Sequence, residues 1–263
     1  MRHVALVAAL VALGQTAACS SKSSGRTVRV AAASDLARAF EELGKAFEAK
    51  THIKPIFSFD SSGLLAKRID QGAPYYLFAS AGKMYTDDVV KNGKCDAASE
   101  KPYARGRIVV WCPNGVQAPM QLADLADPRF RRIAIANPDH APYGKAAQQA
   151  LQKAGVWDKL TDRVKYGENV QATMQFAKTG AVDAAIVALS LAVVTDGGAF
   201  LPIDQSQYDP LDQQLVVCGN GEEADAAHQL VDFINSPEGR EVMTRYGFLL
   251  PAEQLPTAAK PRP

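Results

Sequence analysis

The chain has 263 residues, with 29 lysine and arginine residues against 28 aspartate and glutamate residues. The first 18 residues hold one arginine and no acid, so the rest of the chain is formally neutral. A neutral chain is a poor general binder of nucleic acid, because that affinity comes from clustered cations that neutralise phosphates. Apolar residues make up 47% and charged residues 22%, which excludes a mostly disordered, collagen-like or coiled-coil chain and favours α/β domains.

Residues 1–18 have the pattern of a secretory signal peptide. The basic residue Arg2 precedes the apolar run 4–13, and mostly small residues follow up to Ala18. Ten apolar residues are too few to span a bilayer as a helix. We therefore expect an exported protein of the periplasm or cell envelope.

The end of this segment, Thr-Ala-Ala-Cys at 16–19, resembles a bacterial lipobox, in which the cysteine becomes acylated. Cleavage after Ala18 without acylation is the alternative, because small residues also suit an ordinary signal-peptide site. We expect a lipoprotein anchored at Cys19, with residues 19–26 as a flexible tether. Contact with the membrane would then run only through the lipid.

From Thr27 onward, short β-branched runs alternate with amphipathic segments. The predicted strands are 28–32, 53–59, 77–81, 133–136, 164–166, 184–187 and 215–218. The predicted helices are 35–49, 63–71, 83–92, 144–154, 170–178, 224–235 and one opened by Ser236-Pro237 as N-cap and N1. Repeated βαβ units predict parallel sheets covered by helices on both faces. Residues 252–263 hold three prolines and predict a loose tail.

Three cysteines remain beyond Cys19, and their spacing does not match a zinc site. Cys112 ends the strand-like run 107–112, and Cys218 ends the run 214–218. If these two strands were neighbours, a Cys112–Cys218 disulfide would form in an oxidising compartment. Three buried free thiols, at 95, 112 and 218, are the equally weighted alternative.

Polar segments lie where several predicted strands end and the next helix begins. Ser34 follows the first strand and Ser61-Ser62-Gly63 follows the second, while 141–144 and 167–170 open two helices in the other half. Helix starts offer free N–H groups and a positive dipole end, which hold an anion without a cationic side chain. Two α/β halves also predict a ligand cleft between them.

Several runs in this order resemble the periplasmic molybdate-binding proteins of ABC importers: 28–36, 61–63, 69–74, 77–81, 135–144 and 245–248. The resemblance covers nearly the whole mature chain. It implies a type II periplasmic-binding-protein-like α/β fold, with two lobes joined by hinge strands and a ligand cleft between them. Lobe one would comprise 27–106 plus 205–251, and lobe two would comprise 107–204.

The same resemblance implies a solute-binding protein that captures a tetrahedral oxyanion by hinge closure and hands it to an ABC permease. Molybdate or tungstate is the expected ligand, and the protein would be a monomer without cofactor or catalytic activity. Carried over by motif, Ser34 and Ser62 supply hydroxyl and amide donors, while Tyr143 and Val170 supply amides. Molybdenum would be held as molybdate through these residues. The secondary candidates are Asp35, Ser61 and Ala188.

One departure from the family concerns a tyrosine that many members have where this chain has Ala188. In those members the tyrosine hydroxyl touches the oxyanion. Tyr143 is the residue we expect to supply a hydroxyl in its place.

Asp35 and Asp60 lie next to the predicted anion site. A carboxylate ~4 Å from a dianion costs several kcal/mol at an effective dielectric constant near 20. A ligand that keeps a proton, such as phosphate or arsenate, would use the carboxylate as an acceptor, whereas molybdate or sulfate would avoid it. We expect Asp35 to point to solvent or to backbone N–H groups at its helix start, which leaves molybdate first and a protonated oxyanion second.

An exported enzyme or adaptor on the same fold is the alternative from another class. The chain has no GxSxG motif, and its histidines show no recognisable spacing to a serine and an acid. His140 is expected to be a loop residue rather than a base.

Overall fold

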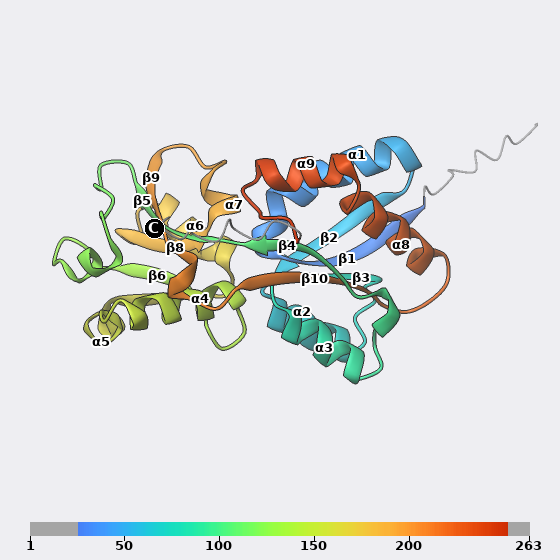
Figure 1. The fold of residues 1–263 in the computed structure, drawn as a ribbon, viewed down its shortest axis with the longest axis horizontal. Coiled ribbons are helices and arrows are strands. Elements are labelled where there is room, and N and C mark those ends of the chain that lie inside the picture. Colours follow the sequence, from blue (N-terminus) through green and yellow to red (C-terminus); the bar gives the residue numbers. More distant parts are fainter. Residues whose placement is uncertain (1–25, 252–263) are drawn as a thin grey trace, which may run out of the picture.

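A computed structural model describes residues 26–251 as two α/β lobes that lie side by side along the long axis (Figure 1). The predicted architecture, an α/β fold of two lobes, is confirmed. The predicted signal peptide, Cys19, the tether up to residue 25 and the tail 252–263 lie outside the described residues. Within 26–251, no helix combines the length and apolar character needed to cross a membrane.

Each lobe is built on a five-stranded sheet. The first sheet has the order β2 (Lys54–Asp60), β1 (Thr27–Ala33), β3 (Leu77–Ser80), β10 (Leu211–Val217) and β4 (Lys101–Gly106). The second has the order β7 (Val164–Gly167), β6 (Ile133–Ala136), β8 (Ala184–Ala188), β5 (Ile108–Pro113) and β9 (Gly198–Pro202).

Helices cover both sheets. In lobe one they are the 3-10 turn η1 (Ser34–Leu36), α1 (Ala37–Thr51), α2 (Ser62–Asp70), α3 (Lys83–Lys91), η2 (Ala97–Ser99), α8 (Glu222–Ile234) and α9 (Pro237–Arg245). In lobe two they are η3 (Leu122–Ala126), α4 (Pro142–Lys153), α5 (Trp157–Leu160), η4 (Thr161–Arg163), α6 (Val170–Lys178) and α7 (Leu189–Ala192), followed by η5 (Gln205–Gln207). Helices α1, α8 and α9 lie on one face of the first sheet and α2 and α3 on the other (Figure 1).

The prediction of parallel sheets is correct for three strands of each sheet and wrong for the other two, because both sheets are mixed. Strands β1, β2 and β3 are parallel, as are β6, β7 and β8, but β10 runs antiparallel to β3 and β4. Strand β5 likewise runs antiparallel to β8 and β9. These antiparallel strands enter or leave a lobe directly from the crossing segments, so no βαβ connection fixes their direction.

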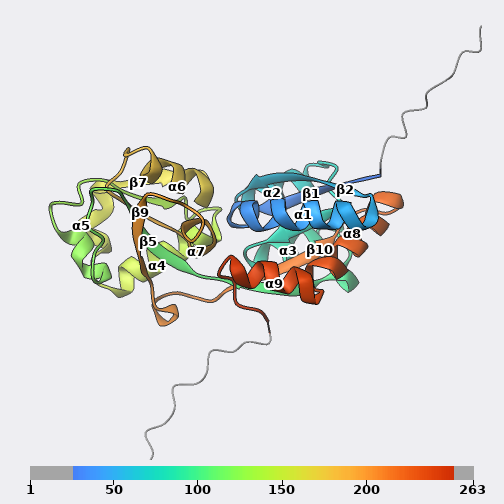
Figure 2. The same cartoon turned by 90° about the horizontal axis from the view of Figure 1, so that it is seen from above.

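Two crossing segments join the lobes. The first is the short step from β4 to β5 at Gly106-Arg107, and the second runs from the end of β9 through η5 into β10. Figure 2 shows α9 reaching toward this crossing region. After α9 ends, the Gly247 carbonyl accepts bonds from the Arg107 guanidinium at 2.7 and 3.0 Å. The lobes are therefore linked by narrow segments rather than by a shared sheet.

The first strand and its helix show how the sequence brings the chain to the cleft. Strand β1 ends with the sequence Val30-Ala-Ala-Ala33. All four residues are at most 2% exposed. Helix α1 buries one apolar stripe that includes Phe40, Leu43 and Phe47. Gly44 lies on that stripe, where a Cβ would be 2.7 Å from the Phe57 ring of β2. Close packing thus fixes where β1 ends and where Ser34 is placed.

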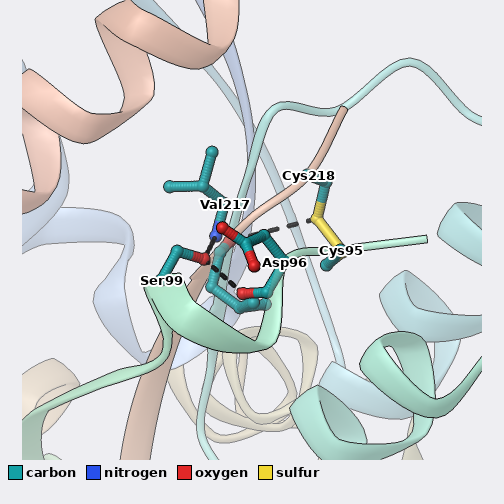
Figure 3. Close-up of a disulfide and its surroundings, with 6 residues drawn as sticks. Cys95, Asp96, Ser99, Val217 and Cys218 are labelled. Carbon is teal, nitrogen blue, oxygen red and sulfur yellow. Dashed lines mark hydrogen bonds between the residues drawn. A yellow bond between two sulfur atoms is a disulfide. The ribbon is translucent and has the colours of Figure 1, made fainter. Parts of the chain in front are cut away.

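The predicted Cys112–Cys218 disulfide is wrong, and so is its alternative of three free thiols. Cys95 pairs with Cys218, and Cys112 is free and buried (Figure 3). Cys112 lies in β5 of the second sheet, whereas Cys218 follows β10 of the first, so the two strands are never neighbours. Burial raises the pKa of the Cys112 thiol to about 11, which keeps it protonated and unreactive.

The segment after α3 brings Cys95 to its partner. The Asp96 N–H donates to the Val217 carbonyl at 2.9 Å, and the Val217 N–H donates to the Ser99 hydroxyl at 2.8 Å (Figure 3). The Ser99 hydroxyl in turn donates to the Asp96 carbonyl at 2.6 Å. These bonds hold residues 95–99 along the end of β10, where the disulfide closes a sequence separation of 123 residues.

Candidate functional site

A small cavity lies between the lobes, where β1 and β2 end and where α2, α4 and α6 begin. Its volume is about 10 Å³, which is about the space that one water molecule requires. Sites for drug-sized ligands measure several hundred Å³. The lining residues are Ala33, Ser34, Asp35, Asp60, Ser61, Ser62, Ala81, Ala141, Pro142, Tyr143 and Val170.

Six of the seven predicted site residues meet at this cavity. Ser34, Ser62, Tyr143, Val170 and the secondary candidates Asp35 and Ser61 all line it. Ala188 does not: it ends β8 within the core and pairs with Ile108 of β5. The strand-to-helix junctions therefore converge from both lobes.

Lobe one contributes two buried hydroxyls. Ser62, the first residue of α2, accepts a hydrogen bond from the Ala81 N–H at 2.9 Å, which leaves its own O–H to donate. Ser34 begins η1 and is 3% exposed, and within residues 26–251 its hydroxyl has no hydrogen-bond partner. Both hydroxyls are thus available to an acceptor in the cavity.

Lobe two contributes the first turns of two helices. In α4, Pro142 occupies the first position and Tyr143 the second. In α6, the Asn169 side chain caps the helix by accepting from the Ala172 N–H at 2.9 Å, and Val170 follows it. The first N–H groups of a helix have no acceptor within the helix, so the amides of Tyr143 and Val170 are free donors with a favourable dipole.

Gly144 explains how α4 comes so close to its strand. A Cβ at this position would be 2.1 Å from the Ala136 carbonyl oxygen at the end of β6. Only glycine permits this approach, which brings the start of α4 down to the cavity.

The side chain of Asp35 does not have the environment that the sequence predicted. Its side chain does not point to solvent but is buried, with 1% exposure. Oδ2 accepts hydrogen bonds from the Tyr143 hydroxyl at 2.9 Å and from Gln213 Nε2 at 2.6 Å, whereas Oδ1 has no partner. Burial raises the pKa of Asp35 to about 6, although the bonds from Gln213 and Tyr143 oppose the rise.

The hydroxyl of Tyr143 is already used, which corrects a second prediction. Its single proton goes to Asp35, and Gln213 Nε2 lies 3.2 Å from its oxygen. Gln213 Oε1 accepts from the Tyr103 hydroxyl at 2.8 Å. The Tyr143 hydroxyl therefore cannot replace the family's missing hydroxyl at Ala188, and its phenol instead completes a buried network around Asp35.

Asp60 has the opposite environment. Its Oδ1 accepts from the Ser61 N–H at 2.8 Å and from Asn169 Nδ2 at 3.0 Å, and its Oδ2 accepts from Arg68 at 2.6 Å. Both oxygens are occupied, and the guanidinium neutralises the charge. Asp60 therefore serves to hold Asn169 of lobe two against lobe one.

Further contacts across the cleft hold the lobes together. The Ser61 hydroxyl lies 2.8 Å from His140 Nδ1, and the Gly63 N–H donates to the His140 carbonyl at 3.0 Å. The Ser190 hydroxyl of lobe two donates to the Asp35 carbonyl at 2.7 Å. The lobes thus close onto one another around the cavity, and His140 is a cleft residue as well as a loop residue.

The lining offers donors that carry no charge. Its hydroxyl and amide groups suit a small anion, and its cationic neighbour Arg68 is bonded to Asp60. Among residues 26–251, no group of three His, Cys, Asp or Glu side chains is placed to hold a metal ion. Such a cavity, enclosed by two α/β lobes on narrow crossing segments, defines a solute-binding protein.

The chain belongs to the family of bacterial extracellular solute-binding proteins, which it matches over residues 28–249. It is 32% identical over 222 residues to the molybdate-binding protein ModA of Rhodobacter capsulatus, covering 84% of this chain and 88% of that protein.

Solved structures agree with this assignment. The periplasmic molybdate-binding protein of Azotobacter vinelandii superposes with a TM-score of 0.80 at 29% identity, covering 85% of this chain and 99% of the other. The sulfate-binding protein SubI of Mycobacterium tuberculosis superposes with a TM-score of 0.74 at 17% identity, covering 86% and 88%. The second likeness shows the fold alone.

Proposed function

We propose that this protein captures a tetrahedral oxyanion, molybdate or tungstate, for an ABC importer. The observation that carries the proposal is the pair of free hydroxyls, Ser34 and Ser62, which face the free helix-start amides of Tyr143 and Val170 across one small cavity. The similarity to molybdate-binding proteins supports the choice of ion. The ligand is bound through its oxygens, so molybdenum is cargo and not a resident metal.

Capture works by closure of the two lobes. Each lobe supplies part of the donor set, so an anion gains its full set of bonds only when the lobes meet. Ser34 and Ser62 come from lobe one, and the amides of Tyr143 and Val170 come from lobe two. Cavity size then separates molybdate from sulfate, because molybdenum–oxygen bonds are longer than sulfur–oxygen bonds.

We further propose that the mature protein is a monomer of the cell envelope, held at the membrane by a lipid on Cys19, and that it delivers its ion to an ABC permease. Mass spectrometry of the membrane fraction tests the anchor. A mature N-terminus at Cys19 with lipid on its thiol is the expected species, and an unmodified Cys19 thiol would contradict it.

A binding role is favoured over catalysis. Ser61 and His140 lie 2.8 Å apart, which resembles a nucleophile and its base, but Nδ1 is the nitrogen that meets the hydroxyl. Among residues 26–251, no acid hydrogen-bonds to the other ring nitrogen to orient it. We therefore propose that this pair fastens the closed lobes and that the protein has no cofactor.

Isothermal calorimetry on the purified mature chain tests the proposal. Molybdate, tungstate, sulfate, phosphate and arsenate are titrated separately at equal ionic strength. Tight binding of molybdate or tungstate with indifference to sulfate is expected. The absence of heat with all five anions would contradict an oxyanion-binding role.

A further inference from the structure

Asp35 has one buried oxygen for which the protein provides no partner. Its Oδ1 is unbonded although the residue is 1% exposed and lines the cavity. Buried polar atoms are almost always hydrogen-bonded, so an unpartnered carboxylate oxygen at a ligand cavity calls for a donor that arrives with the ligand. Its sister oxygen Oδ2 is fixed by Tyr143 and Gln213, which prevents the carboxylate from turning away.

A fully deprotonated oxyanion cannot be that donor. It has only acceptor oxygens, and its charge would repel an ionised Asp35 at close range. One proton between the two groups removes the repulsion and satisfies Oδ1. The neighbouring hydroxyl of Ser34 and the helix-start amides can then bind the remaining oxygens of the anion.

We infer that Oδ1 of Asp35 shares one proton with the bound oxyanion, so that the site takes its ligand in a singly protonated state. This inference rests on the proposed function and specifies the ligand further. Molybdate would take the proton from solvent as it binds, whereas hydrogen phosphate or hydrogen arsenate would bring it. No bond other than O–H is made or broken. On release the proton returns to solvent in the case of molybdate and leaves on the anion in the case of phosphate or arsenate.

Among the titratable groups that face one another here, Asp35 is the one whose protonation changes with pH. Facing it are Gln213 of β10 and the phenols of Tyr103 and Tyr143, whose pKa values are raised well above the ordinary range by burial, so both stay neutral. Asp60 at the end of β2 is paired with Arg68.

The other elements packed against η1 add no free charge near this side chain. Helix α7 faces it with the neutral Ser190, and the lysine of α6, Lys178, is that helix's last residue. Arg38 of α1 is exposed and pairs with Glu41. The His140 ring contacts the Ser61 hydroxyl, with Nδ1 at 2.8 Å from its oxygen.

The sign of the pH dependence follows. Burial raises the pKa of Asp35 to about 6, so below that pH the free protein already carries the proton. Above it, each molybdate bound must take up a proton, and the dissociation constant should rise about tenfold for each further pH unit. Phosphate at pH 8 carries its own proton, so its binding should show no such uptake.

The test is calorimetry of the wild-type protein with sodium molybdate and with inorganic phosphate between pH 5.5 and 8.5, in two buffers of different ionisation enthalpy. Uptake approaching one proton per molybdate at pH 8 is expected for the wild type. Asp35→Asn should take up none and should bind molybdate at least tenfold more tightly than the wild type at pH 8, because its amide donates directly. Asp87→Asn on the exposed face of α3 is the control and should match the wild type.

Each outcome decides something. Molybdate binding without proton uptake by the wild type would overturn the inference and leave the proposed function standing, and this measurement needs no variant. Binding of phosphate or arsenate in place of molybdate would support the inference and change the proposed ion. If neither the wild type nor Asp35→Asn binds any oxyanion at any pH, the proposed function is wrong and the inference is wrong with it.

Discussion

Two aspartates lie where neighbouring parallel strands end and border one cavity, yet their surroundings are opposite. Residue 33 of β1, two residues before Asp35, pairs in register with Asp60 of β2. Both acids are buried, at 1% and 5% exposure. Asp60 has donors on both oxygens, one of them from Arg68, whereas Asp35 has neutral donors on one oxygen and none on the other.

The difference teaches that an acid near an anion site has no single role. Asp60 is neutralised by a cation and holds a residue of the other lobe, so it shapes the site without meeting the ligand's charge. Asp35 lacks a cation, and burial disfavours its charge, so it is ready to hold a proton. Both acids lie at strand-to-helix junctions of the first sheet, and their hydrogen-bond partners differ.

The largest effect should come from removing the two serine hydroxyls that line the same cavity as the two acids. Ser34→Ala combined with Ser62→Ala removes two hydroxyl donors to a charged ligand, each contributing about 1.5–3 kcal/mol, so oxyanion affinity should fall about a thousandfold. Calorimetry measures the loss. Ser206→Ala, an exposed serine on η5, is the control. If the double variant bound the oxyanion as tightly as the wild type, the cavity that the two aspartates border would not be the binding site.

Removing the cation should make Asp60 resemble Asp35. Arg68→Gln leaves a second acid beside the cavity without a cationic partner, so affinity for molybdate should drop about tenfold at low ionic strength through like-charge repulsion. Lys67→Gln, the exposed neighbouring position, is the matched control. Equal affinities for the two variants would mean that the Arg68 charge is irrelevant to the ligand.

Weakening the support of Asp35 should have a smaller effect. Tyr143→Phe removes one donor that favours the ionised form of Asp35, so the loss of one hydrogen bond of about 1 kcal/mol predicts roughly fivefold tighter binding of molybdate above the pKa of Asp35. The pKa of Asp35 should rise further, because that bond lowers it, so the pH above which molybdate affinity declines should move upward. Tyr166→Phe on the exposed side of β7 serves as the control. An unchanged pH dependence of molybdate affinity would show that Tyr143 does not influence the protonation of Asp35.

Removing the disulfide, which lies apart from the residues lining the cavity, should lower stability without changing oxyanion binding. Replacing Cys95 and Cys218 together by alanine should lower the free energy of unfolding by about 2–4 kcal/mol, since the bond constrains a long loop in the unfolded chain. Oxyanion affinity should stay within threefold of the wild type. Denaturant unfolding and calorimetry measure the two quantities, and a large loss of affinity would show that this edge of lobe one controls the site.

Much of the fold follows from local patterns. Helix α6 and strand β6 have the predicted bounds, and Ser236 caps α9 by accepting from the Gly239 N–H as expected. Strands β4 and β9 escaped prediction because both are edge strands with little apolar alternation, and β4 contains Pro102. The antiparallel strands and the true disulfide depend on which lobe each strand joins, which periodicity does not reveal.

The residues that line the cavity could be predicted where they stand at strand-to-helix junctions, whereas the residues that reach it through long-range contacts were missed. Ser34, Ser62, Tyr143 and Val170 stand at such junctions, and the cavity lies among them. Gln213 reaches Asp35 across 178 residues of sequence, and His140 reaches Ser61 across 79. Gln213 did offer one signal, because it is a polar residue at a position of the strand that alternation predicts to be buried, and it is 0% exposed.

An anomalous-difference map from crystals grown with molybdate tests the central claim most directly. The account predicts one molybdenum peak in the cavity between the lobes, with oxygens in hydrogen-bond range of the Ser34 and Ser62 hydroxyls and of Asp35 Oδ1. Molybdenum found elsewhere, or in the cavity with Asp35 turned away from it, would contradict the account.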